Sequence, residues 1–138
     1  MRRLFVGIVL SLLAACPEPP PECIAPEHAL DEGCAPGYVP TFANVYKNTI
    51  KESCGSTKSN CHSAAGRAGG LSFESQDVAY QQLLNSAQGR VIPMNPQCSE
   101  MIVRTNSPGE DYQMPPGDPL SGPARCALVQ WVLQGAQP

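Results

Sequence analysis

Cysteine constrains this chain more than any other residue type. Seven cysteines occur in 138 residues, at positions 16, 23, 34, 54, 61, 98 and 126. In a small exported protein that number indicates covalent chemistry in an oxidising compartment. Cys16 directly follows an N-terminal apolar run and is treated separately, and the other six allow fifteen connectivities if all of them pair. Proximity in the sequence favours Cys23–Cys34 and Cys98–Cys126 as disulfides, which leaves Cys54 and Cys61 to be explained.

The N-terminus has the order of a bacterial export signal. Arg2 and Arg3 precede an apolar run over residues 4–13, and Leu13-Ala14-Ala15-Cys16 follows. The run is too short to span a bilayer as a permanent helix. Leu-Ala-Ala-Cys resembles the lipobox of bacterial lipoproteins, which implies that residues 1–15 are a signal peptide and that Cys16 becomes the lipid-anchored N-terminus. The alternative is an ordinary cleaved signal.

The expected anchor would be firm, since two or more acyl chains hold a protein stably where one does not. Residue 17 is Pro and not Asp, so the resemblance implies the outer membrane, with the protein facing the periplasm or the cell surface.

The segment after Cys16 is predicted to be a disordered tether. Residues 17–40 contain seven prolines, and residues 16–37 contain five acidic residues but no Lys or Arg. Such a segment cannot bury a core. Residues 38–138 hold seven charges of each sign, so the domain is neutral and nucleic acid is not expected as a partner. The predicted organisation is a signal peptide at 1–15, a lipid anchor and tether at 16–40, and a domain at 41–138.

Within the domain the hydrophobic pattern predicts four helices and two long loops. A first helix is capped by Thr41 and runs into Cys54, with Phe42, Val45, Tyr46 and Ile50 on one face. Further helices are expected over 76–84 (with Val78, Leu83 and Leu84 facing inward), after Cys98 (with Met101 in the core), and over 126–135. Residues 62–75 and 107–123 are rich in Gly, Ser or Pro and are predicted as loops. The fold class is therefore all-α, small and loop-rich.

One group of residues carries a chemical signature. Cys54 and Cys61 are followed directly by His62, and Met114-Pro115-Pro116 comes about fifty residues later. A cysteine followed by histidine, with a second cysteine upstream, is typical of c-type haem attachment. A methionine sulfur on the opposite side of the iron raises its reduction potential. We expect Met114 to supply that sulfur, with Met94 as a rival in a loop.

These motifs, together with Gly69-Gly70-Leu71 and the run from Trp131 to Ala136, resemble small cytochrome c-like domains of planctomycete and myxobacterial lipoproteins. The resemblance covers roughly residues 41–136. It implies the class I cytochrome c fold, in which the terminal helices pack across each other, with Trp131 in that packing. Carried over by position, it implies thioether bonds from Cys54 and Cys61 to haem c. It also implies His62 as proximal ligand and Met114 as distal ligand of the iron.

The sequence departs from the family pattern in the cysteine spacing. Six residues separate Cys54 from Cys61, where the usual motif has two. One hypothesis is a monomeric, membrane-tethered single-haem electron carrier, not an enzyme, which serves a periplasmic redox protein. The alternative is a haem-free lipoprotein with a Cys54–Cys61 disulfide and a binding or structural role. A zinc site of Cys54, Cys61, His62 and one further cysteine is a third reading. No hydrolase motif is present.

Overall fold

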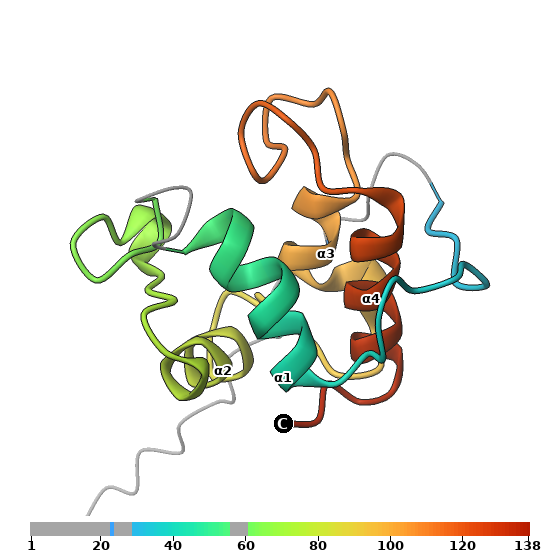
Figure 1. The fold of residues 1–138 in the computed structure, drawn as a ribbon, viewed down its shortest axis with the longest axis horizontal. Coiled ribbons are helices and arrows are strands. Elements are labelled where there is room, and N and C mark those ends of the chain that lie inside the picture. The colour runs from blue at the N-terminus through green and yellow to red at the C-terminus, as the bar shows by residue number, and fades with distance from the viewer. Residues whose placement is uncertain (1–22, 24–28, 56–60) are drawn as a thin grey trace, which may run out of the picture.

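The computed structural model describes residues 23, 29–55 and 61–138, and its regular elements in these ranges are all helical. They are α1 (Phe42–Val45), η1 (Tyr46–Cys54), η2 (Ala68–Gly70), α2 (Gln76–Leu84), η3 (Pro96–Cys98), α3 (Glu100–Thr105) and α4 (Gly122–Leu133). Figure 1 shows the rod of α1 and η1 in the middle, with α2 on one side and α3 and α4 on the other. The prediction of a small, all-α, loop-rich domain is confirmed.

The first helix begins where it was predicted but changes its winding. The Thr41 side chain accepts a hydrogen bond from the Asn44 amide and caps α1. From Tyr46 onward the helix is a π-helix, in which the Gly55 amide bonds to the Ile50 carbonyl at 2.8 Å. Thr49 and Ile50 are both buried in this stretch. Such stretches are rare and often lie at functional sites. This one ends at Cys54.

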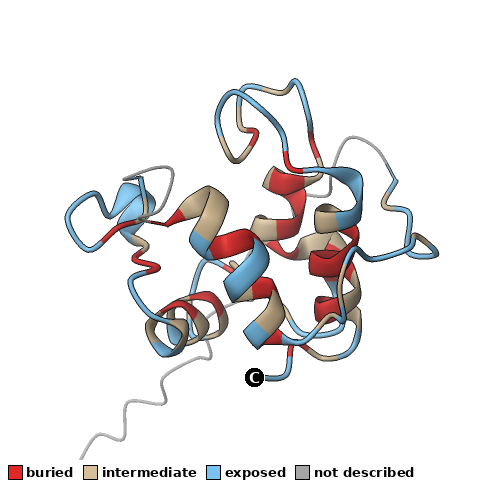
Figure 2. Cartoon of the chain, viewed as in Figure 1, coloured by how far each residue is buried: buried red, intermediate tan, exposed pale blue. Residues whose placement is uncertain are grey.

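The core lies where the terminal helices cross. Phe42 of α1 packs on Trp131 of α4 with 5.1 Å between ring centroids, and both side chains are 1 % exposed. Tyr80 of α2 meets Phe42 edge-on at 4.9 Å. Figure 2 shows that the buried faces of the helices point toward one another. The predicted packing of Trp131 between the first and last helices is confirmed.

The other helices differ from prediction in small ways. Helix α2 has the predicted bounds, but Ala79 and Leu83 are its buried residues, and Val78 and Leu84 are half-buried. Helix α3 follows Cys98 as predicted. Helix α4 begins four residues earlier than predicted. The Ser121 side chain caps it by accepting from the Ala124 amide, and a proline in the first turn is compatible with a helix start.

Both predicted disulfide pairings are wrong, although all four cysteines are cross-linked. Cys23 is bonded to Cys98 and Cys34 to Cys126. Proximity in the sequence misled the prediction because residues 29–40 run back along α4. There the Gly37 amide donates to the Pro123 carbonyl at 3.0 Å.

Part of the segment predicted as a tether therefore packs on the domain. Leu30 and Tyr38 contact the hydrophobic core, and the Gln130 side chain of α4 donates to the Glu32 carbonyl. The ordered domain thus begins before residue 41. Residues 1–22 and 24–28, which include the predicted signal peptide and Cys16, lie outside the described residues. In the described part of the chain, no helix combines the length and apolar character needed to cross a membrane.

Candidate functional site: a pocket between His62 and two methionines

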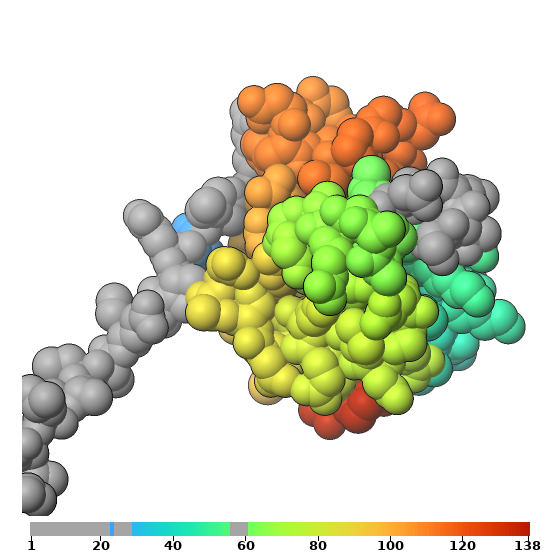
Figure 3. Space-filling view, turned by 90° about the vertical axis from the view of Figure 1, so that its left-hand side faces the viewer, coloured from blue at the N-terminus to red at the C-terminus, as the bar shows by residue number. Residues whose placement is uncertain are grey.

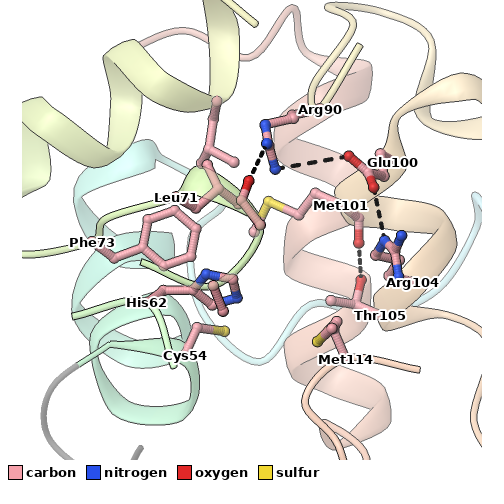
Figure 4. Close-up of a pocket in the computed structure, with 13 residues that line it drawn as sticks. Cys54, His62, Leu71, Phe73, Arg90, Glu100, Met101, Arg104, Thr105 and Met114 are labelled. Atoms are coloured by element: carbon pink, nitrogen blue, oxygen red, sulfur yellow. Dashed lines mark hydrogen bonds and ion pairs between the residues drawn. The ribbon is translucent and has the colours of Figure 1, made fainter. Parts of the chain in front are cut away.

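A pocket of about 190 Å³ lies between the end of η1, the loop over 61–75 and helix α3. The loop forms the surface between α2 and the segment that follows α3 (Figure 3). Two kinds of side chain line the pocket, as Figure 4 shows. The apolar and sulfur-bearing group comprises Cys54, Leu71, Phe73, Leu83, Met101 and Met114, beside His62. The charged group comprises Arg90, Glu100 and Arg104.

His62 is held in the pocket by its backbone and by one aromatic contact. Its amide donates to the Cys54 carbonyl at 3.3 Å, and its carbonyl accepts from the Phe73 amide at 2.7 Å. The imidazole lies against the Phe73 ring with 5.0 Å between centroids. Its Nδ1 atom is buried and has no hydrogen-bond partner among the described residues. A buried nitrogen without a partner is unfavourable unless a ligand meets it.

The environment of His62 favours the neutral imidazole. Burial is the main cause that lowers its pKa, and the positive charge of Arg90 acts in the same direction. The backbone carbonyls of Ala68 and Leu71 oppose this by favouring the protonated ring. A neutral imidazole keeps the lone pair that binds a metal ion.

The two cysteines of the motif have different environments. Cys54 is half-buried and lines the pocket, whereas Cys61 is exposed and does not line it. Both lie outside the two disulfides, so the Cys54–Cys61 bond of the haem-free alternative is not formed. Burial, helped by the negative charge that Cys61 can carry, raises the pKa of Cys54 to about 11. No group of three or more His, Cys, Asp or Glu side chains suited to a metal ion occurs in the described ranges.

The methionines divide clearly between pocket and surface. Met114 lines the pocket, as the resemblance implied, while Met94 is 74 % exposed. Met101 was predicted as a core residue, but it lines the same pocket and is only partly buried against the core. Helix α3 is short, and its fully buried positions are taken by Ile102, Val103 and Thr105. Two methionine sulfurs therefore compete for the role assigned to Met114.

Gln113 orders the loop that carries Met114. Its Nε2 donates to the carbonyls of Pro115 and Gly117, each at 2.8 Å, and its Oε1 accepts from the Gly109 amide at 2.7 Å. The Met114 amide in turn donates to the Arg104 carbonyl at 2.9 Å. This buried glutamine was missed in the sequence, because a polar residue in a Pro- and Gly-rich stretch shows no periodicity.

The charged wall was also missed. Arg104 Nε lies 2.9 Å from Glu100 Oε1 on the same helix, and Arg90 Nη1 lies 3.9 Å from Glu100 Oε2. The spacing of Glu100 and Arg104 is that of a helical ion pair and was visible in the sequence. No pattern in the sequence indicated Arg90, because a long-range backbone contact places it at the pocket. In this contact the Arg90 carbonyl accepts a hydrogen bond from the Met101 amide at 2.9 Å.

The residues present fit a c-type haem. A buried imidazole and methionine sulfurs are iron ligands that such a group uses, and a cysteine at the rim of the pocket is the residue type that attaches it. The volume is below the roughly 300–1,000 Å³ of typical small-molecule pockets. The described cavity therefore admits an edge of a porphyrin rather than the whole ring.

Comparison with known proteins supports the same family. The family model of planctomycete cytochrome C matches residues 59–118, which include Cys61, His62 and Met114 but not Cys54. No curated protein and no solved structure matches the chain. Over residues 59–118, the chain is similar to a small cytochrome c-like domain of the planctomycete cytochrome C type.

Proposed function

We propose that this protein is a lipid-anchored electron carrier with one covalently attached haem. In this proposal Cys54 and Cys61 would hold the haem through thioether bonds, and His62 and Met114 would bind its iron. Haem iron held in this way would supply one-electron exchange. With both residues bound to the iron, no position would be left for a substrate, which is the reason for proposing a carrier and not an enzyme.

The observation that carries the proposal is the environment of His62. Its buried Nδ1 has no hydrogen-bond partner among the described residues, and its ring lines the same pocket as Cys54 and Met114. Phe73 fixes the position of the ring, and the bonds of Gln113 fix the loop that carries Met114. Two segments far apart in the sequence, one with Cys54 and His62 and the other with Met114, thus line one small cavity.

The location follows from the N-terminal sequence. The proposed anchor is Cys16 in the cell envelope, with the outer membrane as the site and a periplasmic redox protein as the partner. Intact mass of membrane-extracted protein should show the loss of residues 1–15 together with added acyl mass. Soluble protein that is cleaved elsewhere, with Cys16→Ser behaving identically, would contradict the anchor.

The haem is tested by expressing the full chain together with a haem-attachment system. The purified protein should be red, and its denatured mass should include one haem. His62→Ala should abolish the sharp absorption band of the reduced protein. Met114→Ala should lower the reduction potential and leave the haem attached. Met101→Ala is the matched control, because it removes a sulfur from the same pocket, and the potential should stay near that of the wild type. A colourless protein without haem mass would overturn the proposal.

A second candidate is favoured by the disulfides. Cys23–Cys98 and Cys34–Cys126 cross-link the fold without using Cys54 or Cys61, so the domain has a source of stability that does not depend on haem. That suits a haem-free lipoprotein with a binding or structural role. A colourless protein that still unfolds cooperatively in urea would favour this candidate.

A further inference from the structure

The pocket contains a methionine that the proposed haem site does not use. Met101 of α3 lines the cavity together with Met114 and His62. Haem iron that binds one histidine and one methionine has no place for a second sulfur. Figure 4 shows both methionine side chains and the imidazole of His62 around the same space. Two thioethers and one imidazole in a single cavity are therefore more metal ligands than the electron carrier requires.

The backbone holds these three side chains around the cavity. Met101 belongs to α3, and the Met114 amide donates to the Arg104 carbonyl at 2.9 Å, which ties the loop of Met114 to the same helix. The imidazole of His62 lies against the Phe73 ring with 5.0 Å between centroids. A methionine side chain has three rotatable bonds and a polarizable sulfur. The two sulfurs can therefore adjust to a bound ion while the backbone stays in place.

His62 has the surroundings of a metal-binding histidine. Its Nδ1 is buried and has no hydrogen-bond partner among the described residues. The backbone carbonyls of Ala68 and Leu71 favour a ring N–H. Histidines that bind metals commonly donate one ring N–H to a backbone carbonyl or carboxylate and bind the metal through the other nitrogen. One nitrogen of this ring is thus available to an ion in the pocket.

The chemistry of the pocket favours monovalent copper. Thioether sulfur is a soft ligand, and soft ligands select Cu(I), whereas carboxylates suit hard ions. Glu100 is the carboxylate among the lining residues, and it is paired with Arg90 and Arg104. Two arginines beside one glutamate leave this wall positive, and a divalent ion is repelled about twice as strongly as a monovalent one. Leu71 and Leu83 add apolar surface, which limits the access of water to a bound metal.

We propose that the pocket of the haem-free protein binds one Cu(I) ion through an imidazole nitrogen of His62 and the sulfurs of Met101 and Met114. Cys54 lines the same pocket, and its sulfur adds a further soft ligand in the wild type. The inference goes beyond the proposed function and does not rest on it, because it needs neither thioether bonds nor haem iron.

The test uses the full chain with Cys54→Ser/Cys61→Ser, produced without haem attachment. The exchange removes two thiols that could bind copper by themselves, and both disulfides stay in place. Cu(I) is titrated without oxygen, with ascorbate present, in competition with the chelator bicinchoninate. We expect one Cu(I) per chain. In this background Met101→Leu and Met114→Leu, which nearly conserve volume, and His62→Ala should each weaken Cu(I) binding at least about tenfold.

Met94→Leu in the same background is the matched control. It makes the same exchange at a methionine that is 74 % exposed and does not line the pocket, so the affinity for Cu(I) should not change. Circular dichroism should show the same helical content in all variants. Copper X-ray absorption should show sulfur neighbours in the background and fewer of them in the Met101→Leu variant, a loss that a merely structural role would not cause.

Three results would overturn the inference. The first is a background that does not bind Cu(I). The second is equal affinity of the Met101→Leu and Met94→Leu variants, which would place the copper elsewhere on the chain. The third is Zn(II) binding as tight as that of Cu(I), which would contradict the choice of a soft monovalent ion.

The outcomes separate this inference from the proposed function, because the thiol-free background cannot form thioether bonds. Cu(I) binding that needs both methionines, together with a wild type that acquires no haem, would support the inference and overturn the carrier. Haem attachment to the wild type, with Cu(I) binding that does not depend on Met101, would do the reverse. Success of both experiments would support both, with copper and haem as alternative occupants of one pocket.

Discussion

The side of the domain around α4 is cross-linked by disulfides, whereas the side around His62 is held by weaker contacts. Cys34 is bonded to Cys126 in α4, and Cys23 to Cys98 just before α3. Around His62 the described contacts are hydrogen bonds and ring packing, such as that from the Tyr46 hydroxyl to the Phe73 carbonyl at 3.1 Å. The protein thus places its disulfides away from the two cysteines that haem attachment would use. We therefore expect the α4 side to be the more stable of the two in the haem-free protein.

The largest expected effect tests whether the two sides unfold together. Phe42 contacts Tyr46, Tyr80 and Trp131 and so joins them. Phe42→Ala should lower the free energy of unfolding by about 3–5 kcal/mol, because it leaves a cavity in the core. Urea denaturation followed by Trp131 fluorescence and by circular dichroism should give one shared transition. Val39→Ala, at a position 67 % exposed, should change stability by less than about 0.5 kcal/mol. Two separate transitions in the wild type would mean that the sides are independent.

The next largest effect is expected from removing the disulfide that joins Cys34 to Cys126 in α4. The double variant Cys34→Ser/Cys126→Ser should lose about 2–5 kcal/mol of unfolding free energy, since the bond spans 92 residues of sequence and restricts the unfolded chain. Cys61→Ser in the haem-free protein is the control. It alters an exposed side chain and should have little effect. Non-reducing peptide mapping should recover Cys23 with Cys98, and recovery of Cys23 with Cys34 would refute the described pairing.

The rate at which the Cys54 thiol reacts with alkylating agents should depend on pH. Because burial and Cys61 raise the pKa of Cys54 from 9.0 to about 11, Cys54 stays protonated below that pH, and only the thiolate reacts with alkylating agents. At pH 8 Cys54 in the haem-free protein should react about a hundredfold more slowly than a thiol of ordinary pKa, since each pH unit is a factor of ten. Its rate should rise about tenfold per unit up to pH 11. Fast labelling of Cys54 at pH 8 would show that the pocket is open to solvent.

The smallest effect is expected from removing one tyrosine hydrogen bond on each side of the domain. The Tyr46 hydroxyl bonds the Phe73 carbonyl, and the Tyr80 hydroxyl bonds the Ala136 carbonyl, each at 3.1 Å. Tyr46→Phe and Tyr80→Phe should each cost about 0.5–1.5 kcal/mol. We expect only Tyr46→Phe to speed hydrogen exchange of the Phe73 amide, which donates to His62. Equal exchange in both variants would show that the loop around His62 is not locally weaker.

Local signals in the sequence predicted most of the fold. Thr41 and the apolar face after it located the first helix, and the apolar run around Trp131 located the last. The π-helical winding of η1 was not predicted. The hydroxyl of the buried Thr49 bonds that of Tyr38, a residue assigned to the border of the tether.

The site was predicted in part. Cys54, His62 and Met114 meet in one pocket as the resemblance implied, and their roles as haem ligands stay predictions. Met101 was misplaced because a methionine beside Ile102 and Val103 looks like core, and only the direction of α3 turns it to the pocket. The disulfide partners and Arg90 depend on how distant segments lie together in space, which no spacing in the sequence encodes.

The order of the disulfides along the chain has a mechanical consequence. Any tension that reaches the domain from the N-terminal side of Cys23 passes first through its covalent bond to Cys98. Residues 29–40 and α1 lie beyond that junction and are shielded from the pull. Cys98 precedes Glu100 by two residues, so the force would enter beside the charged wall of the pocket. Were the chain pulled from its N-terminal side, the load would therefore enter the domain at Cys98, beside Glu100 and its two arginines.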